Sequence, residues 1–393
     1  MKRITVYVMI LVFAVFAGCK DKNPAAVKNG ELTVCYKSLL KDTVDIPLSL
    51  LTEELQIVKL DDADAALVSD RQNITVSENY IVAGNEGNTP AKLFERQTGK
   101  YITDLGSVGQ GPGEYSQHIY HIQIDEKNGR IYLLPMMPSQ ILSYDLQGNF
   151  KDEKLYIPVR VPKSIFHVNG KDSIITFAVL PFTGIKTLVW SQKNMQIIQR
   201  YPTGHLSVNV DFSNEVISGF NNENVFDFQI FKFFEPGNDS LYHYDIEKNI
   251  LTPVFTLDFS GSEISTHAYM ELPQHYTGNF AVMLQTTVTG ENSTATTPVD
   301  KFYIVDKKTL KASYFRLKND FLGGIEVDNP IWRFKNGYFS QNCDPSVLLE
   351  QLENTLVSNK KLSEKMRAKL TELKNSISED KDNNYILYAK LKK

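Results

Sequence analysis

The segment GSVGQGPGEY, which runs from Gly106 to Tyr115, contains four glycines and a proline in ten positions. The backbone N–H groups of such a loop can bind a phosphate when the loop leads from a strand into a helix. Here the glycines are spaced as Gly109-x-Gly111-x-Gly113, which is not the G-x-G-x-x-G pattern, and the residues HIYHIQIDE that come next alternate as a strand. No Gly-Lys-Ser/Thr sequence occurs either. We therefore expect no nucleotide cofactor at this segment.

Two histidines, His118 and His121, form an H-x-x-H pair, a spacing that can hold zinc when it lies on a helix. On a strand, residues three apart point to opposite faces, so these two side chains cannot converge on one ion. The catalytic motifs G-x-S-x-G and H-E-x-x-H do not occur in the chain. The sequence therefore predicts no metal and identifies no catalytic residue.

A segment rich in rings and polar groups, HAYMELPQHYTGNF, begins at His267. We interpret it as a loop between repeated units, in which Tyr269, His275 and Tyr276 are candidates for contact with a sugar ring or a peptide. The alternative is that these aromatic residues belong to the core or anchor the loop, as is common in strand-rich folds. Phe231, Phe233 and Phe234 of QIFKFFEPG are interpreted as packing between sheets.

These residues must be positioned by a fold that repeats along the chain. A turn followed by an apolar or alternating strand recurs six times, as NYIVA, GRIYL, DSIIT, NVFDF, GNFAV and NGYFS. Five of the copies are followed by a strand, a polar turn and another strand. Aligning these turns on Gly99, Gly148, Asn194, Lys248 and Thr309 gives spacings of 49, 46, 54 and 61 residues.

Each unit therefore holds about four short strands, and such a sheet must stack on its neighbours to bury both faces. Six four-stranded sheets around one axis make an all-β, six-bladed β-propeller, which we predict for residues 32–393. In that fold GSVGQGPGEY joins the first blade to the second. Gly109, Gly111, Pro112 and Gly113 shape the joint, and Glu114 and Tyr115 are expected to bond to neighbouring backbone or to the next blade.

The last unit is interrupted. Asp344-Pro345 is a helix start, and two amphipathic runs with apolar residues at helical spacing follow it. NYILYAKL, from Asn384, then alternates as a strand. We predict a helical insertion at about 344–379 within the last blade, packed on the propeller; the alternative is a coiled coil with a partner, for which the apolar stripe is short.

The N-terminus reads as a secretory signal over residues 1–18, with Lys2 and Arg3 before an apolar run. FAGC, ending at Cys19, resembles the bacterial lipoprotein cleavage box, which implies lipidation of Cys19; the alternative is an uncleaved anchor. Residues 19–31 are interpreted as the lipidated cysteine and a flexible tether. Cys35 and Cys343 are either two separate buried thiols or a disulfide that joins the ends of the fold.

The chain of 393 residues carries a net charge of -4, which argues against nucleic acid as a partner. With its repeats, GQGPGEY, Asn238-Asp-Ser-Leu-Tyr and the closing Asp382-Asn-Asn-Tyr, it resembles the six-bladed β-propeller lipoproteins of Gram-negative gut bacteria, relatives of the NHL-repeat propellers. The resemblance implies an outer-membrane lipoprotein, attached to the membrane through Cys19. Whether it faces the periplasm or the surface stays open.

Three functions are compatible with such a tethered propeller. We favour a binding or interaction module for a glycan, peptide or protein partner, because no catalytic set is recognisable and a lipid anchor is expected. The alternative is a hydrolase or lyase with an active site at the mouth of the propeller channel, which converging carboxylates at one end of the axis would favour. A structural part of an envelope complex ranks third.

Overall fold

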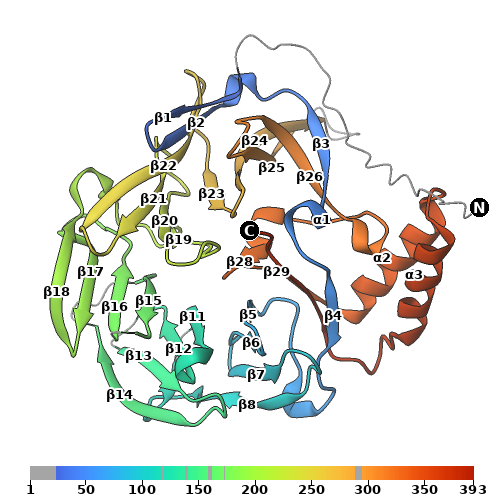
Figure 1. The fold of residues 1–393 in the computed structure, drawn as a ribbon, viewed down its shortest axis with the longest axis horizontal. Helices are drawn as coiled ribbons and strands as arrows, with labels where there is room; N and C mark the ends of the chain where they lie inside the picture. Colours follow the sequence, from blue (N-terminus) through green and yellow to red (C-terminus); the bar gives the residue numbers. More distant parts are fainter. Residues whose placement is uncertain (1–23, 117, 138–139, 158–161, 172, 288–293) are drawn as a thin grey trace, which may run out of the picture.

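The computed structural model describes residues 24–116, 118–137, 140–157, 162–171, 173–287 and 294–393. Over these residues, six sheets of four or more strands are arranged in a ring around one axis (Figure 1). Hydrophobic clusters fill the spaces between neighbouring sheets. The predicted six-bladed β-propeller is therefore confirmed.

Blades 1 to 3 are each formed by four strands that are consecutive in the chain. The strands of each blade are given in order from the innermost to the outermost. Blade 1 consists of β5 (Ile74–Val76), β6 (Tyr80–Ala83), β7 (Ala91–Glu95) and β8 (Tyr101–Leu105). Blade 2 consists of β11 (Ile119–Asp125), β12 (Arg130–Pro135), β13 (Gln140–Tyr144) and β14 (Phe150–Tyr156). Blade 3 consists of β15 (Ile165–Asn169), β16 (Ile174–Ala178), β17 (Thr187–Lys193) and β18 (Gln196–Pro202).

Blades 4 to 6 complete the ring. Blade 4 is built from β19 (Glu215–Ile217), β20 (Phe226–Phe231), β21 (Leu241–Asp245) and β22 (Ile250–Asp258). Blade 5 is built from β23 (His267–Glu271), β24 (His275–Thr287), β25 (Thr294–Asp306), β26 (Ala312–Asn319) and β27 (Ile325–Glu326). Blade 6 is built from β28 (Phe334–Lys335), β29 (Tyr338–Cys343), β30 (Tyr385–Lys390) and β4 (Gln56–Lys59).

The N-terminal residues run along the outer edges of three consecutive blades. After β1 (Ala26–Asn29), strand β2 (Leu32–Tyr36) pairs parallel with β22 of blade 4. Strand β3 (Thr43–Pro47) pairs parallel with β26 of blade 5, and the short helix α1 (Leu48–Leu51) leads to β4, which pairs antiparallel with β30. We call β2, β3 and β4 the N-terminal belt. Within residues 19–31, for which a tether is expected from the sequence, Ala26–Asn29 form the first strand of the β1–β2 hairpin.

The repeated units coincide with the blades. All six copies of the first motif fall on the second strand of a blade, although Gly278 lies inside β24 rather than in the turn before it. The turns between third and fourth strands contain a residue with positive φ: Gly99, Gly148, Asn194, Asn249 and Leu310. In blades 4 and 5 that residue comes one position after the aligned Lys248 and Thr309. Glycine and asparagine recur in these turns because they tolerate this conformation.

The interruption in blade 6 is a pair of helices between β29 and β30. Helix α2 (Pro345–Ser358) begins where the Asp344 carboxylate accepts a hydrogen bond from the Ser346 N–H at 2.8 Å, and α3 (Glu364–Ser376) follows. Both lie at the rim of the ring beside β4 (Figure 1). Leu352 and Leu370 are fully buried in a core cluster shared with blades 5 and 6. The apolar stripe therefore packs on the protein's own core and not in a coiled coil with a partner.

The antiparallel strands divide the loops between two faces of the ring. The turns that join first to second and third to fourth strands lie on one face, which we call the turn face. The loops that join second to third strands, and the connections between blades, lie on the opposite face, which we call the connection face. GSVGQGPGEY, which connects β8 to β11, belongs to the connection face.

Candidate functional site

The glycine-rich joint is filled by one of its own side chains. The short strands β9 (Ser107–Val108) and β10 (Glu114–Tyr115) pair in parallel and close the loop. The Glu114 carboxylate accepts hydrogen bonds from the Gly111 N–H at 2.7 Å and the Ser107 hydroxyl at 3.0 Å, and these donors hold its pKa below the usual value. A Cβ on Gly109 would lie 2.1 Å from a Glu114 oxygen. An acid thus occupies the place where a phosphate cradle would bind its anion.

The same joint is bonded to both blades that it connects. The hydroxyl of Tyr115 accepts a hydrogen bond from the Ala91 N–H at 2.7 Å and donates one to the Leu105 carbonyl at 3.0 Å, both in blade 1. From blade 2, the hydroxyl of Tyr144 donates to the carbonyl of Gly113 at 2.7 Å. Pro112 is exposed at the tip of the loop. The segment joins two blades, and its polar groups are used within the fold.

Replacing Tyr115 with phenylalanine is expected to lower the free energy of unfolding by about 1–3 kcal/mol, because the buried Ala91 N–H would lose its acceptor. Urea denaturation of purified protein measures this. Tyr80→Phe is the matched control, since the Tyr80 hydroxyl makes no hydrogen bond within the described residues, and it should change stability by less than about 0.5 kcal/mol. Equal effects of the two substitutions would contradict the role given to Tyr115.

The three aromatic ligand candidates lie elsewhere than expected. The segment from His267 is the β23–β24 hairpin inside blade 5, not a loop between units. Tyr269 is 2% exposed and Tyr276 is 7% exposed, and the Tyr276 ring stacks on Phe255 with centroids 4.6 Å apart. His275 is partly buried, with its Nε2 3.7 Å from an Asp306 oxygen. Both tyrosines are core residues, because β23 and β24 carry them into the space between blades 4 and 5.

Both described cysteines are free thiols. Cys35 lies on β2 in the cluster between blades 4 and 5, whereas Cys343 ends β29 in the cluster beneath the helices. Burial raises the pKa of each thiol to about 12. The disulfide considered from the sequence is therefore not formed, and the two residues act as small buried side chains.

A loop of blade 4 crosses the axis of the propeller on the turn face. Phe220, between β19 and β20, stacks between His121 of blade 2 and His167 of blade 3, with ring centroids at 5.3 and 6.4 Å. Next to it, the Asn221 amide donates to the carbonyls of Glu271 in blade 5 and Phe334 in blade 6, at 3.1 and 3.2 Å. Phe220 itself has a φ of 49°. This loop occupies the turn-face end of the axis, where one channel mouth would open.

The two histidines of the H-x-x-H pair differ in their surroundings. His121 is buried, whereas His118 is exposed just before β11. Burial, together with the positive charge of Lys335, holds the pKa of His121 well below its usual value, so the ring is neutral. Across the part of the chain that the structure describes, no three His, Cys, Asp or Glu side chains converge as metal ligands.

Exposed aromatic side chains gather on the connection face. Among the described residues, the exposed phenylalanine and tryptophan side chains are Phe212, Phe233, Phe234 and Trp332, and all four lie on loops of that face. Phe233 and Phe234 are 46% and 71% exposed, so they are not packed between sheets as their sequence suggested. Their rings contact each other edge to face, with centroids 4.8 Å apart.

The loops that carry these rings are held in place by hydrogen bonds. The Phe233 N–H donates to the side chain of Asn214 at 3.0 Å, and its carbonyl accepts from the Thr266 hydroxyl at 2.8 Å. Asn209 donates to Glu235 at 2.6 Å and so links the 203–214 and 232–240 loops. We call the exposed, large apolar residues of these two loops the aromatic surface: Val210, Phe212, Phe233 and Phe234.

A cavity of ≈ 300 Å³ opens beside the aromatic surface. It lies between the connection from blade 3, which includes the 3₁₀ helix Gly204–Leu206, and the strands β20, β21 and β22 of blade 4. Lys232, at one wall, immediately precedes Phe233 in the chain. The lining residues are His205, Leu206, Ile230, Lys232, Asn238, Asp239, Ser240, Tyr242 and Thr256.

One buried carboxylate in this cavity is only half satisfied. Asp239 is 7% exposed, and its Oδ1 accepts a hydrogen bond from the Ser240 N–H at 2.7 Å. Its Oδ2 is buried and makes no hydrogen bond within the described residues. Burial raises the pKa of Asp239 to about 7, while the Ser240 N–H, the Lys232 ammonium and the Gln229 side-chain amide offset part of that rise. Asp239 therefore contributes a buried, polar group to the wall of the cavity.

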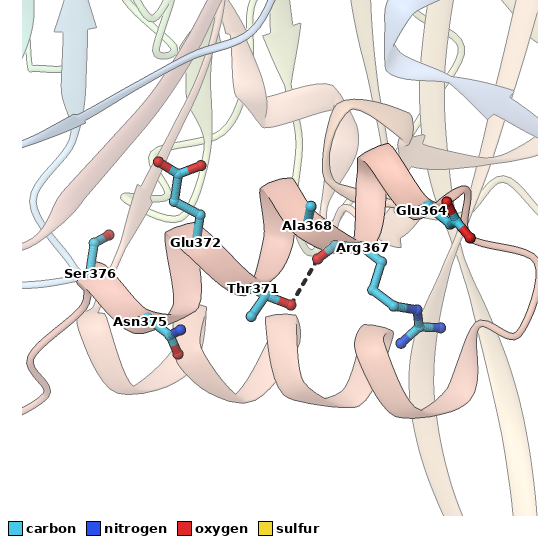
Figure 2. Close-up of a pocket in the computed structure, with 7 residues that line it drawn as sticks. All are labelled: Glu364, Arg367, Ala368, Thr371, Glu372, Asn375 and Ser376. Atoms are coloured by element: carbon cyan, nitrogen blue, oxygen red, sulfur yellow. Dashed lines mark hydrogen bonds between the residues drawn. The ribbon is translucent and has the colours of Figure 1, made fainter.

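A second hollow, of ≈ 750 Å³, lacks a buried polar group of the kind that Asp239 provides in the first. All of its lining residues come from the single helix α3, as Figure 2 shows. The Thr371 hydroxyl there donates to the carbonyl of Arg367 in its own helix at 2.8 Å. Because no other element contributes a side chain, this hollow is the outer face of α3 and holds no converging polar groups.

Sequence reasoning missed both parts of the candidate site. Phe233 and Phe234 are adjacent, so they cannot both point inward from a strand, and this break in alternation was an available signal. Asn238-Asp239-Ser240 was noticed only as part of a family resemblance. The cavity arises from packing between the connection from blade 3 and the strands β20, β21 and β22, which no local sequence pattern displays.

None of the described helices has the length and apolarity that a membrane span requires. No curated protein matches the sequence. Among solved structures, a protein described as exported, from Bacteroides fragilis, is similar with a TM-score of 0.55 and 15% identity, over 90% of this chain and 100% of that one. A DUF4221-family protein of Bacteroides vulgatus has a TM-score of 0.43 and 11% identity, over 87% and 97%.

The propeller from β2 to β30 coincides with the extent of one family model. That model, described as a domain of unknown function, DUF4934, matches residues 33–390. The match covers all six blades and the helical pair, including the cavity and the glycine-rich joint. The chain belongs to the DUF4934 family.

Proposed function

We propose that this protein is a carbohydrate-binding module of the bacterial cell envelope. Its binding site is the aromatic surface together with the Asp239 cavity on the connection face. The observation that carries the proposal is the conjunction of exposed rings on fixed loops with a polar cavity beside them, which the buried Asp239 lines. Sites for small ligands combine apolar and aromatic walls with a few placed polar groups in this way.

The chemistry of the surface favours a glycan over a peptide or protein partner. Rings such as Phe234, 71% exposed, offer flat apolar faces to the C–H face of a sugar. Carboxylate, amide and hydroxyl groups at Asp239, Asn238 and Ser240 match the hydroxyl groups of its edge. The rings border a small polar cavity, an arrangement that suits a small ligand such as a sugar ring.

The number of carboxylates in the cavity supports binding of a sugar without hydrolysis. Glycoside hydrolysis generally uses a pair of carboxyl groups on opposite sides of the scissile bond. Among the described residues that line the cavity, Asp239 is the one carboxylate. The cavity therefore fits recognition of a sugar better than its cleavage.

The proposed location is outside the cytoplasm, with attachment to the outer membrane through a lipidated Cys19. Residues 1–23, which include the signal and Cys19, lie outside the described residues. Support comes from the signal-like apolar run of the sequence and from the similar Bacteroides fragilis structure, whose description is that of an exported protein. The same proposal includes membership of this protein in the bacterial propeller lipoproteins.

Affinity electrophoresis through gels that contain neutral, acidic or amino-sugar polysaccharides tests the function. We expect the purified protein to be retarded by at least one polysaccharide class, and the double variant F233A/F234A to lose that retardation, by at least about tenfold in affinity. Both residues are exposed, so the variant should keep the stability of the parent protein.

The matched control is M195A/I198A, because Met195 and Ile198 are also exposed apolar residues but belong to the β17–β18 hairpin, away from the connection face. It should bind as the parent protein does. Failure of every polysaccharide class to retard the protein, or equal retardation of F233A/F234A, would overturn the proposed function.

A further inference from the structure

We infer that the protein binds one small oxyanion, a phosphate or a carboxylate group, at the axis of the propeller, through the side chains of His121, His167 and Lys335. This axial site lies against Phe220, in the loop of blade 4 that crosses the axis. It is separate from the carbohydrate site proposed for the connection face and goes beyond that function, so the two proposals are tested independently.

The three side chains of the axial site come from the innermost strands of three blades. His121 is on β11 of blade 2, His167 on β15 of blade 3, and Lys335 on β28 of blade 6. One loop brings them together. Both imidazole rings stack on Phe220, and the side-chain amide of the next residue donates to the carbonyl that directly precedes Lys335, at 3.2 Å. Nitrogen donors from three blades therefore meet beside this loop.

These donors lack acceptors within the protein and are open to solvent. Nδ1 of His121 accepts from the Phe166 N–H at 3.3 Å, which places the proton of the neutral ring on Nε2. Among the described residues, neither this Nε2–H nor the ammonium of Lys335 has an acceptor, and neither nitrogen is sealed from solvent as the Nε2 of His267 is. Lys335 is partly exposed and His167 is exposed. A small acceptor can therefore reach all three groups.

The charges at the axial site favour an anion. Burial lowers the pKa of Lys335 to about 8, so most of the ammonium stays protonated at neutral pH, and no carboxylate contributes to that shift. Burial also lowers the pKa of both histidines, and the charge of Lys335 lowers that of His121 further. The one acid that acts on these rings is Asp125, which raises the pKa of His167. An unpaired ammonium held among protein atoms repels a metal cation and gains from a charge-assisted hydrogen bond to an anion.

The backbone of the loop beside the site is strained. Phe220 has a φ of 49°, a conformation that bulky side chains rarely adopt. It is held there because its N–H donates to the Asp227 carboxylate at 3.2 Å, while the Asn336 N–H donates to the carbonyl of Gly219 at 2.7 Å. Strained residues cluster at ligand sites, where the surrounding structure keeps them in place. The strain thus presents the ring of Phe220 to both histidines and points independently to a site at the axis.

Titration calorimetry of the purified protein with sodium phosphate and with sodium acetate, each against sodium chloride at equal ionic strength, tests the axial site. We expect one equivalent of at least one oxyanion to bind, and Lys335→Met to weaken that binding about tenfold or more, because a charge-assisted hydrogen bond is lost. Methionine keeps the apolar stem and removes a partly buried charge, so the variant should fold. Lys193→Met is the control, because Lys193 is exposed in the β17–β18 hairpin, and it should bind as the parent does.

His167→Gln provides a second variant whose folding is not in question, since His167 is exposed. We expect it to weaken binding of the same oxyanion about threefold or more, through the loss of one N–H donor. In the parent protein, NMR titration with that oxyanion should shift the ring resonances of His167, and the shift should be absent from K335M at the same concentration.

Binding of phosphate, acetate or both that K335M weakens and K193M keeps would support the axial site, and the salt that binds identifies the ligand group as phosphate or carboxylate. No binding of either salt at millimolar concentration, or equal binding by K335M and K193M, would overturn it. The proposed carbohydrate function is judged separately: F233A/F234A should keep oxyanion binding, and K335M should be retarded by polysaccharide as the parent protein is.

Discussion

Replacing Ile386 with alanine is expected to lower the free energy of unfolding by about 2–5 kcal/mol. Ile386 lies on β30, is fully buried, and pairs with Val58 on β4 in the strand pair that joins the two ends of the chain. Its side chain packs in the cluster between blades 6 and 1. Truncation removes buried apolar surface and also leaves a cavity at the seam of the ring, where β30 pairs with β4.

Urea denaturation followed by circular dichroism measures this change. The control is Val357→Ala, because Val357 is 80% exposed on α2 and its truncation should change stability by less than about 0.5 kcal/mol. A loss for I386A no greater than that of V357A would show that the seam does not contribute to the stability of the ring.

Replacing Gly106 with alanine is expected to cost about 2–5 kcal/mol, which combines an unfavourable backbone conformation with overpacking. Gly106 has a φ of 70°, and a Cβ there would lie 2.3 Å from the Gly113 carbonyl oxygen and 2.4 Å from the Tyr144 hydroxyl. These two atoms are themselves hydrogen-bonded at 2.7 Å, so the methyl group would enter the bond that ties the joint to blade 2.

Comparison with Gly129→Ala separates the cost of overpacking at Gly106 from the cost of the backbone conformation. Gly129 has a φ of 64°, but a Cβ there would have no heavy atom within 4 Å, so only the conformational cost of about 1–2 kcal/mol is expected. Thermal and urea denaturation of the two variants should therefore differ. Equal losses of stability in the two variants would mean that the glycine-rich joint accommodates the added methyl group. The close contacts at Gly106 would then not contribute to the stability of the protein.

The parts of the fold that could be predicted are those in which the pattern is local. A turn residue with positive φ, such as Gly99 or Asn194, stands next to strands with apolar alternation, and the pair of signals recurs at nearly regular spacing. The helix cap at Asp344 and the strand from Tyr385 are local in the same sense. Repetition then specifies how the units stack.

The N-terminal belt could not be predicted in this way. Strands β2 and β3 pair in parallel with β22 and β26, which are distant in sequence, and their register depends on edges that exist only after blades 4 and 5 have formed. The belt also gives blade 6 its fourth strand, so the sixth unit is split between the two ends of the chain.

The candidate site was even harder to predict from the sequence than the N-terminal belt, because it depends on tertiary structure. Tyr269 and Tyr276 have the composition expected of a ligand site, yet the register of β23 against β24 places them in the core. Phe233 and Phe234 have the composition of a core, yet the loop after β20 leaves them exposed. Both places carry aromatic side chains, and the path of the backbone determines which of them are exposed.

The N-terminal belt also constrains the order in which the protein can be made. Strand β4 leaves the ribosome before blades 1 to 5, but its partner β30 follows all the other strands of the ring. During translation β4 therefore has an unpaired edge, and unpaired edges invite aggregation and proteolysis. A translation product that stops before Tyr385 lacks the strand that pairs with β4, so this strand pair cannot close the ring.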